Sequence, residues 1–415
     1  MIEAPTPGAP DDTEEHDEPP LAPLLELRDG LPPVVDEPAA YERMLEAFSS
    51  ASGPVALDAE RASGYRYSQR AYLIQLRREG AGTTLIDPIP FESQQPLQQA
   101  LGDAEWILHA ASQDLACLAE IGLRPGTLFD TELAGRLLGY PRVGLATLVE
   151  TTLGRRMKKE HSAVDWSTRP LPQPWLEYAA LDVEVLIELR ELLGRELEAA
   201  GKQEWAAQEF AHLAAGAPAS PRVDPWRRTS GLHRVRGRRG LAAVRALWET
   251  RDEIAARRDL TPGRIIGDAA IVEAANALPR DRRTLLGLHG FHGRGAERYA
   301  NQWVAALREA RELPETDLPE LTLKHDGPPP PRAWADKDPA AAARLTAARA
   351  AMSELSEQHN VPIENLLSPD LLRRILWEPP AGEGPLEARV RERLAAAGAR
   401  PWQIDLTTPV ILAAL

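Results

Sequence analysis

The sequence predicts an α/β layer fold built on a five-stranded mixed sheet, followed by two all-helical bundles. Apolar, partly β-branched runs alternate with segments of helical period over the first half of the chain. Between Gly216 and Arg239 the composition turns to Pro, Ser and Arg, and helical patterns follow. Two of these helical segments repeat, LTPGRIIGDAAIVEAA from Leu260 and VPIENLLSPDLLRRIL from Val361, at an offset of 101 residues.

The expected elements of the α/β part can be placed in chain order. They are a helix at 41–49, strands at 54–60, 71–78 and 83–89, a short helix at 94–101, a strand at 106–111, a helix at 112–122, a strand and a helix within 127–139, a helix at 145–153 and a long amphipathic helix from about residue 174. Gly-containing turns separate the first three strands, which indicates antiparallel neighbours. Strands mixed with helices in this way define the α/β class.

Four carboxylates fall at suggestive places in this scheme. Asp58 and Glu60 end the first strand two residues apart, so their side chains face the same side. Asp114 opens the helix after the fourth strand. Tyr178 and Asp182 are i and i+4 on the long helix, and are therefore neighbours on one face. Such a cluster would repel itself unless divalent cations neutralise it, and all-oxygen ligands suit Mg²⁺ or Mn²⁺ and not zinc.

Two such ions would support the hydrolysis of a phosphodiester. One lowers the pKa of an attacking water, the other stabilises a leaving 3′-oxygen, and together they hold a phosphodiester between them. Tyr178 stands one helical turn from Asp182 and is placed to orient or help deprotonate that water. Three alternatives stay open at this point: an RNA 3′-exonuclease, a DNA 3′→5′ exonuclease, and a non-catalytic nucleic-acid-binding protein. A contact to the sugar 2′-OH would distinguish RNA from DNA, and no sequence feature supplies one.

The net charge of −14 argues against a nucleic-acid partner until its distribution is considered. Residues 1–22 are acidic without Lys or Arg, whereas 222–239 contain seven arginines against one aspartate. Arg155, Arg156, Lys158 and Lys159 form a second basic cluster. Both clusters are compatible with phosphate binding and with a solvated face or a linker.

The compartment follows from what the sequence lacks. No apolar run approaches the ~20 residues of a membrane span. The single cysteine, Cys117, excludes an intramolecular disulfide, and the N-terminus shows no signal-peptide pattern. We therefore expect a cytoplasmic protein with no membrane partner.

Three motifs carry a family resemblance. DAE (58–60), HAASQDL (109–115) and YAALD (178–182) resemble, in this order, the exonuclease motifs of the DEDD superfamily of 3′→5′ exonucleases. A tyrosine four residues before the last aspartate is similar to the DEDDy branch. The two helical modules resemble tandem HRDC domains, the second more weakly after Trp377. The combination resembles the ribonuclease D family from about residue 22 to the end.

The resemblance implies an RNase H-like exonuclease domain and a function. The protein would be a 3′→5′ exoribonuclease that releases nucleoside 5′-monophosphates, with a role in tRNA 3′-end maturation. Its partner would be RNA with an accessible 3′ end, such as tRNA precursors, and we expect a monomer. Asp58, Glu60 and Asp182 would bind the nucleophile-side ion. Asp58 would bridge to the second ion, supported by Asp114.

The motifs depart from the family pattern at two positions. Ala59 and Arg61 stand where the family usually has Thr and an aromatic or aliphatic residue. Arg61 either contacts a substrate phosphate or points to solvent. The predicted organisation is a disordered acidic tail (1–22), a DEDDy exonuclease domain (23–215), a linker (216–234), a first HRDC domain (235–315), a Pro-rich linker (316–334) and an HRDC-like domain (335–415).

Overall fold

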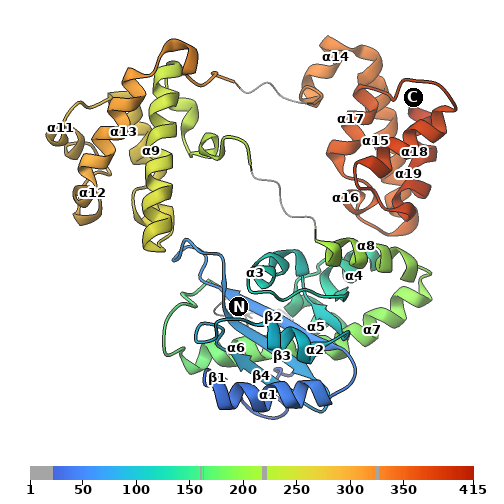
Figure 1. The fold of residues 1–415 in the computed structure, drawn as a ribbon. Helices are drawn as coiled ribbons and strands as arrows, with labels where there is room; N and C mark the ends of the chain where they lie inside the picture. Colours follow the sequence, from blue (N-terminus) through green and yellow to red (C-terminus); the bar gives the residue numbers. More distant parts are fainter. Residues whose placement is uncertain (1–21, 159–160, 162, 217–221, 323–326) are drawn as a thin grey trace, which may run out of the picture.

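The computed structural model contains one α/β part and two helical bundles (Figure 1). The predicted acidic tail lies outside the described residues except for its last position. Among the residues that the structure describes, none of the helices combines the length and the apolar character that crossing a membrane requires. The structure describes residues 22–158, 161, 163–216, 222–322 and 327–415.

The α/β part begins the chain. Its strands are β1 (Val34–Val35), β2 (Val55–Arg61), β3 (Ala71–Arg78), β4 (Gly82–Ile86), β5 (Glu105–Leu108) and β6 (Thr127–Asp130). Its helices are α1 (Pro38–Ser50), α2 (Gln95–Leu101), α3 (Leu115–Glu120), α4 (Thr131–Leu138), α5 (Leu145–Leu153), α6 (Gln173–Glu184), α7 (Leu186–Ala199) and α8 (Gln203–Ala215). The long helix expected from residue 174 is divided at Val185 into α6 and α7.

The strands form one mixed sheet in the order β1-β4-β3-β2-β5-β6. The predicted fold class is confirmed, but the described sheet has six strands and not five. The additional strand, β1, pairs in parallel with β4 through Val34 and Val35. Two residues are too few to show a period-2 pattern, and they directly follow Pro32 and Pro33, which indicate a turn.

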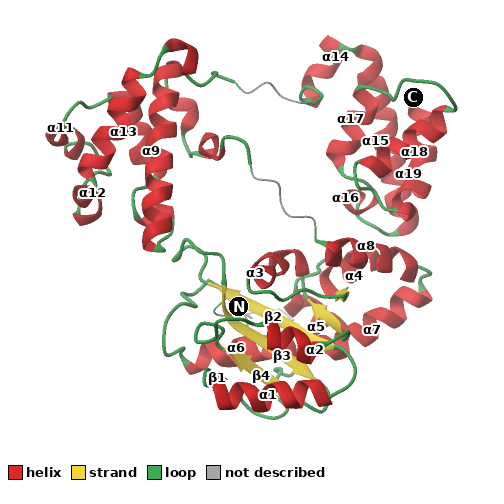
Figure 2. Ribbon diagram, viewed as in Figure 1, coloured by secondary structure: helices red, strands yellow, loops and turns green. Residues whose placement is uncertain are grey.

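Alternation along β2 assigns the two faces of the sheet. Val55 and Leu57 pack with residues of α1 and α2 in one hydrophobic cluster. Ala56 belongs to another cluster, which includes Val183 and Leu186 from α6 and α7. Because side chains alternate, Asp58 and Glu60 share the face of Ala56 and lie toward α6. Figure 2 shows the sheet between these helical layers.

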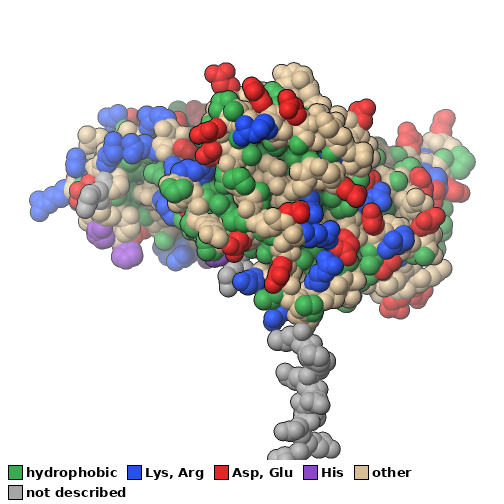
Figure 3. Space-filling view, turned by 90° about the horizontal axis from the view of Figure 1, so that it is seen from below, with side chains coloured by type: hydrophobic (Ala, Val, Ile, Leu, Met, Phe, Trp, Pro, Cys, Tyr) green, Lys and Arg blue, Asp and Glu red, His purple; other side chains and the backbone are tan. Residues whose placement is uncertain are grey.

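The first bundle consists of α9 (Gly237–Arg258), α10 (Asp268–Ala277), α11 (Arg282–Leu286), α12 (Arg294–Arg298) and α13 (Ala300–Glu312). Its core includes Trp226, Phe291 and Trp303. Residues 235–315 carry fifteen arginines against eleven acidic side chains, the opposite balance to the whole chain. In the view from below, Lys and Arg side chains gather at the end of the molecule where this bundle lies (Figure 3).

Three arginines of the 222–239 cluster have internal partners. Arg238 Nη2 donates to the carbonyl of Leu318 at 2.6 Å. Arg239 donates to carbonyls in the last turn of α13 and to that of Leu313 just after it, and Arg227 Nη2 donates to Glu320 O at 2.8 Å. These side chains satisfy carbonyls at the end of the bundle, so part of the basic cluster is structural.

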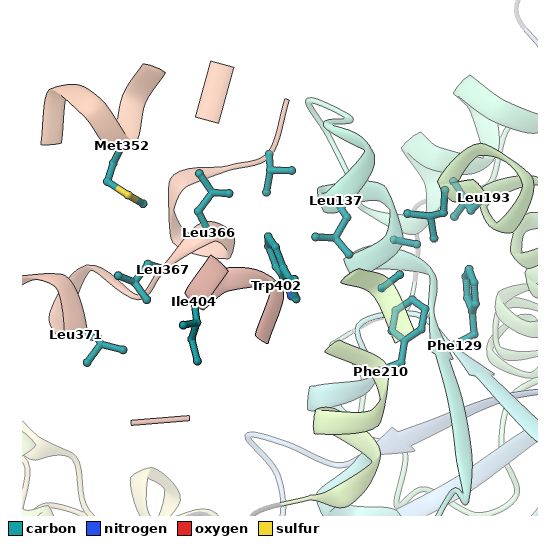
Figure 4. Packing of buried hydrophobic residues seen from close by; sticks show 14 of the residues in the cluster. Phe129, Leu137, Leu193, Phe210, Met352, Leu366, Leu367, Leu371, Trp402 and Ile404 are labelled. Atoms are coloured by element: carbon teal, nitrogen blue, oxygen red, sulfur yellow. The ribbon is translucent and has the colours of Figure 1, made fainter. Parts of the chain in front are cut away.

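The second bundle consists of α14 (Trp334–Lys337), α15 (Pro339–His359), α16 (Ile363–Leu366), α17 (Pro369–Trp377), α18 (Leu386–Ala396) and α19 (Pro401–Ala414). Its hydrophobic core is continuous with that of the α/β part. Trp402 lies opposite Leu137 and Phe210 (Figure 4). Its ring stacks on that of Trp205, with the ring centroids 4.9 Å apart. Lys202 Nζ donates to Leu137 O at 2.6 Å and to a carbonyl of the bundle, that of His359, at 2.7 Å.

Candidate active site

Asp58 and Glu60 are placed by β2, an interior strand of the sheet. β2 pairs with antiparallel β3 along its whole length, and with parallel β5 at Val55 and Ala56. The register with β3 shifts between Glu60 and Arg61, which marks a bulge at the end of the strand. Bulges redirect side chains locally and occur often beside active sites. The two carboxylates therefore come from a fixed backbone that ends in a local irregularity.

Helix α6 supplies the groups that face this strand end. It contacts β2, β3 and β4, and it carries Tyr178 and Asp182 one turn apart. The Tyr178 hydroxyl and the Asp182 carboxylate are hydrogen-bonded. Ligand oxygens of Asp58, Glu60 and Asp182 all lie within 4.8 Å of one another. Residues separated by more than 120 positions thus form one acidic group.

Asp114 lines the same cavity from the start of helix α3. It is the N-cap residue of α3, after a short 3-10 turn over residues 111–113. Its Oδ1 lies 3.9 Å from Arg61 Nη2, so Arg61 does not simply point to solvent. Asp114 is outside the compact three-carboxylate group but lines one cavity of about 510 Å³ with Asp58, Glu60, Tyr178 and Asp182.

A buried aspartate that the sequence analysis did not identify holds the turn before Asp114. Asp130, at the end of β6, accepts hydrogen bonds from the N–H groups of Ala110 at 3.1 Å and Ala111 at 2.8 Å. The same carboxylate accepts from the first turn of α4, at Glu132 N and Leu133 N. It therefore fixes the loop after β5 against the start of α4. Its N-cap role could be read from the sequence, but its contact with Ala110 could not.

Burial and mutual repulsion change the acidity of the cluster. Burial raises the pKa of Asp58 to about 6. Burial, with repulsion from Asp58, raises the pKa of Asp114 to about 8. The pKa of Glu60 rises to about 10, because it is buried and faces the other carboxylates. Burial and Asp58 also raise the pKa of Asp182. Without a cation, the cluster therefore holds protons at neutral pH.

The donor set fits hard divalent cations. The three grouped carboxylates offer oxygen ligands from a region small enough for one ion to bind all of them. A cation would take the place of the bound protons and offset the repulsion between the carboxylates. The acidic cluster is therefore compatible with divalent metal binding.

Other side chains complete the cavity wall. His109 lines it, and its Nδ1 lies 2.9 Å from Thr131 Oγ1. Burial lowers the pKa of His109 to about 4, so the ring is neutral. Glu132 also lines the cavity and was missed, because nothing in the sequence distinguishes it from other acids in a first helical turn.

Gln75, opposite Asp58 on β3, is fully buried, and both atoms of its amide lack a hydrogen-bond partner.

Comparisons with known proteins identify the family. A family model described as 3'-5' exonuclease matches residues 32–198, which contain all the predicted site residues. The ribonuclease D of Granulibacter bethesdensis is 36% identical over 292 residues, 68% of this chain and 70% of that protein. The chain belongs to the ribonuclease D family. The predicted 3′→5′ exoribonuclease of the ribonuclease D type is thereby confirmed.

Solved structures agree with the ribonuclease D assignment. A protein from Bifidobacterium adolescentis has a TM-score of 0.87 at 36% identity, covering 95% of this chain and 99% of that one. Escherichia coli RNase D, described as an exoribonuclease involved in structured RNA processing, has a TM-score of 0.64 at 27% identity. That match covers 90% of this chain and 98% of the E. coli chain.

The two helical bundles match different family models. The HRDC model matches residues 240–307, inside the first predicted bundle. Residues 327–415 match a model described as 3' to 5' exonuclease C-terminal domain. The HRDC-like character of the second bundle and the domain boundaries stay predictions.

Proposed function

We propose that this ribonuclease D-type enzyme hydrolyses RNA 3′ ends at the cavity formed by Asp58, Glu60, Asp114, Tyr178 and Asp182, with two divalent ions, Mg²⁺ or Mn²⁺. The single observation that supports this most strongly is the convergence of Asp58, Glu60 and Asp182 within 4.8 Å. Carboxylates with raised pKa values rarely gather without a function. Structural ion pairs do not explain them, since Arg61 is the one cation near the group among the described cavity residues.

Each residue has a proposed role. Asp58, Glu60 and Asp182 would hold one ion, and Asp58 with Asp114 would hold the other. When bound, such ions supply an activated water and stabilise the charge on the leaving 3′-oxygen. Tyr178, fixed by its hydrogen bond to Asp182, orients the attacking water. Burial and the negative charge of Asp182 raise the pKa of Tyr178 above its ordinary value of 10.0. Its hydroxyl therefore stays protonated and donates a hydrogen bond to Asp182.

The proposed substrate is RNA with an accessible 3′ end, and the proposed role is tRNA 3′-end maturation by a monomer. The family relationship supports RNA, and E. coli RNase D is described as acting in structured RNA processing. The excess of arginine in the first bundle supports attraction of a phosphate backbone.

The test uses the full chain with matched 3′-tailed RNA and DNA, in Mg²⁺, in Mn²⁺ and with chelator. Release of mononucleotides from RNA in either metal, with loss in chelator, supports the proposal. Faster hydrolysis of the DNA would favour the DNA exonuclease. Binding of either strand without metal-dependent release would favour a non-catalytic binding protein and contradict the proposed roles.

A further inference from the structure

The loop between β2 and β3, residues 62–70, forms part of the cavity rim and is here named the rim loop. It begins directly after Arg61, and its Ser63 lines the cavity. Tyr65 Oη donates at 3.4 Å to the carbonyl of Ala163, another cavity residue. Arg66 Nε donates to Ser167 Oγ at 2.7 Å. The rim loop is thus hydrogen-bonded to residues 163–167, of which Ala163 and Val164 also line the cavity.

The first helical bundle holds the rim loop from outside. Tyr67 Oη donates to Asp252 Oδ2 at 2.9 Å. The N–H of Thr261 donates to Tyr65 O at 3.1 Å. The guanidinium of Arg264 lies 4.5 Å from the centre of the Tyr65 ring, over its face. These contacts join residues nearly two hundred positions apart in the chain.

Asp259 contacts both the rim loop and strand β3. One carboxylate oxygen accepts from Ser68 N at 2.9 Å, and the other accepts from Tyr72 Oη at 3.2 Å. Tyr72 is the residue that the β2–β3 register skips: Glu60 pairs with Leu73, and the next position, Arg61, pairs with Ala71. Asp259 therefore binds the bulged residue of β3 directly opposite the step from Glu60 to Arg61.

The backbone of Asp259 shows that this position is an unusual one. The residue ends α9 in the left-handed region, with φ 46° and ψ 50°. Glycine is the usual residue at such a helix end, because a side chain there crowds the following carbonyl oxygen. Asp259 keeps a side chain at this place, and both of its oxygens serve the contact with the exonuclease domain.

We propose that Asp259 is a positioning residue for the exonuclease site, acting from the first helical bundle through Tyr72 and the rim loop. It stabilises the bulge that directs Glu60 and Arg61 toward the cavity. Asp252 supports the same loop through Tyr67. The bundle therefore contributes to the geometry of the metal ligands, in addition to any contact with RNA. This inference rests on the proposed role of Glu60.

The second bundle provides a matched control. Asn360 Nδ2 donates to Leu138 O at 3.1 Å across the other contact between a bundle and the α/β part. Neither residue lines the cavity. Asn360→Ala removes one such hydrogen bond without touching the rim loop or the bulge. A general loosening of the molecule would therefore be seen in this variant too.

The experiment measures Mn²⁺ affinity without RNA, by calorimetry, together with kcat and KM on a short single-stranded RNA. We expect Asp259→Ala to weaken Mn²⁺ binding about tenfold and to lower kcat by about the same factor, as for other groups that orient metal ligands. KM should change little. Asp259→Asn keeps an acceptor for Ser68 N and should restore part of both quantities.

A milder variant keeps the inference testable if Asp259→Ala does not fold. Tyr67→Phe keeps the ring packed against the bundle and removes only the bond to Asp252, so a smaller change in the same direction is expected. Hydrogen exchange of the Ser68 amide should be faster in Asp259→Ala than in the wild type or in Asn360→Ala. The inference would be overturned if Asp259→Ala kept the wild-type Mn²⁺ affinity, kcat and Ser68 exchange rate. It would also be overturned if Asn360→Ala lost as much in these three quantities as Asp259→Ala. Failure of the wild type to cleave RNA would count against the proposed function alone, because the exchange and Mn²⁺ comparisons do not involve RNA.

Discussion

Replacing Asp58 with Asn should abolish activity and yet stabilise the metal-free protein. Burial raises the pKa of Asp58 from its ordinary value of 3.8 to about 6 in the folded protein. The folded state therefore binds more protons than the unfolded state across this window, and its stability falls as pH rises through it. A difference of about two pKa units corresponds to ~3 kcal/mol of unfolding free energy near pH 8.

Asn removes this unfavourable ionisation and can still accept the hydrogen bond from the Ala59 N–H. In chelator near pH 8 we expect the variant to be more stable by about 1–3 kcal/mol, since it buries no charge at position 58 and no longer repels the neighbouring carboxylates. Below about pH 4 the two proteins should be equally stable, because Asp58 is then protonated in both states.

The assay is denaturant unfolding of the full chain in chelator at both pH values, repeated with Mg²⁺. Added Mg²⁺ should stabilise the wild type more than the variant, because the variant lacks a ligand. Mononucleotide release should fall by about 10³-fold or more, as expected when a group that stabilises transition-state charge is lost. A less stable variant in chelator near pH 8, or one with unchanged turnover, would refute the proposed cluster of repelling metal ligands.

Three further predictions concern single features. Tyr178→Phe removes the hydroxyl bonded to Asp182 and should lower kcat by about 10–100-fold with Mn²⁺ affinity unchanged, measured by kinetics and calorimetry. Mg²⁺ binding should release protons and strengthen with rising pH, because the pKa values of Glu60 and Asp114 are raised; the heat of binding should then depend on the buffer's ionisation enthalpy. Lys202→Met leaves buried carbonyls without a donor and should lower the unfolding free energy by about 1–3 kcal/mol, measured by denaturant.

Each of these has a contradicting result. Weaker Mn²⁺ binding in Tyr178→Phe would make the tyrosine a support for the metal site and not an orienter of water. Binding heats that are the same in all buffers would mean that the carboxyls are already ionised. Wild-type stability of Lys202→Met would show that the contact with the second bundle does not depend on this lysine.

The local geometry of the candidate site residues was predictable, because two short periodicities determine it. Alternation along a strand placed Asp58 and Glu60 on one side, and the helical repeat placed Tyr178 one turn from Asp182. Their meeting across more than 120 residues was an inference from charge repulsion and from the family resemblance. The position of Asp114 at the opening of α3 was read correctly from the apolar strand that precedes it.

The rest depended on tertiary partners, which local patterns do not show. β1 has two residues and therefore no period to detect. Arg238 and Arg239 belong to a cluster that composition alone left open between phosphate binding and structure, and in the fold they bind backbone carbonyls. Asp130 and Asp259 bind loop residues remote from them in sequence, so these contacts became visible only with the fold.

Diffraction from crystals grown with Mn²⁺ and a nucleoside 5′-monophosphate, recorded at the manganese absorption edge, tests the central claim most directly. We predict two anomalous peaks in the cavity, one contacted by Asp58, Glu60 and Asp182 and the other by Asp58 with Asp114 nearby. Peaks elsewhere on the protein, or none in this cavity at saturating Mn²⁺, would contradict the claim that these carboxylates hold the catalytic ions.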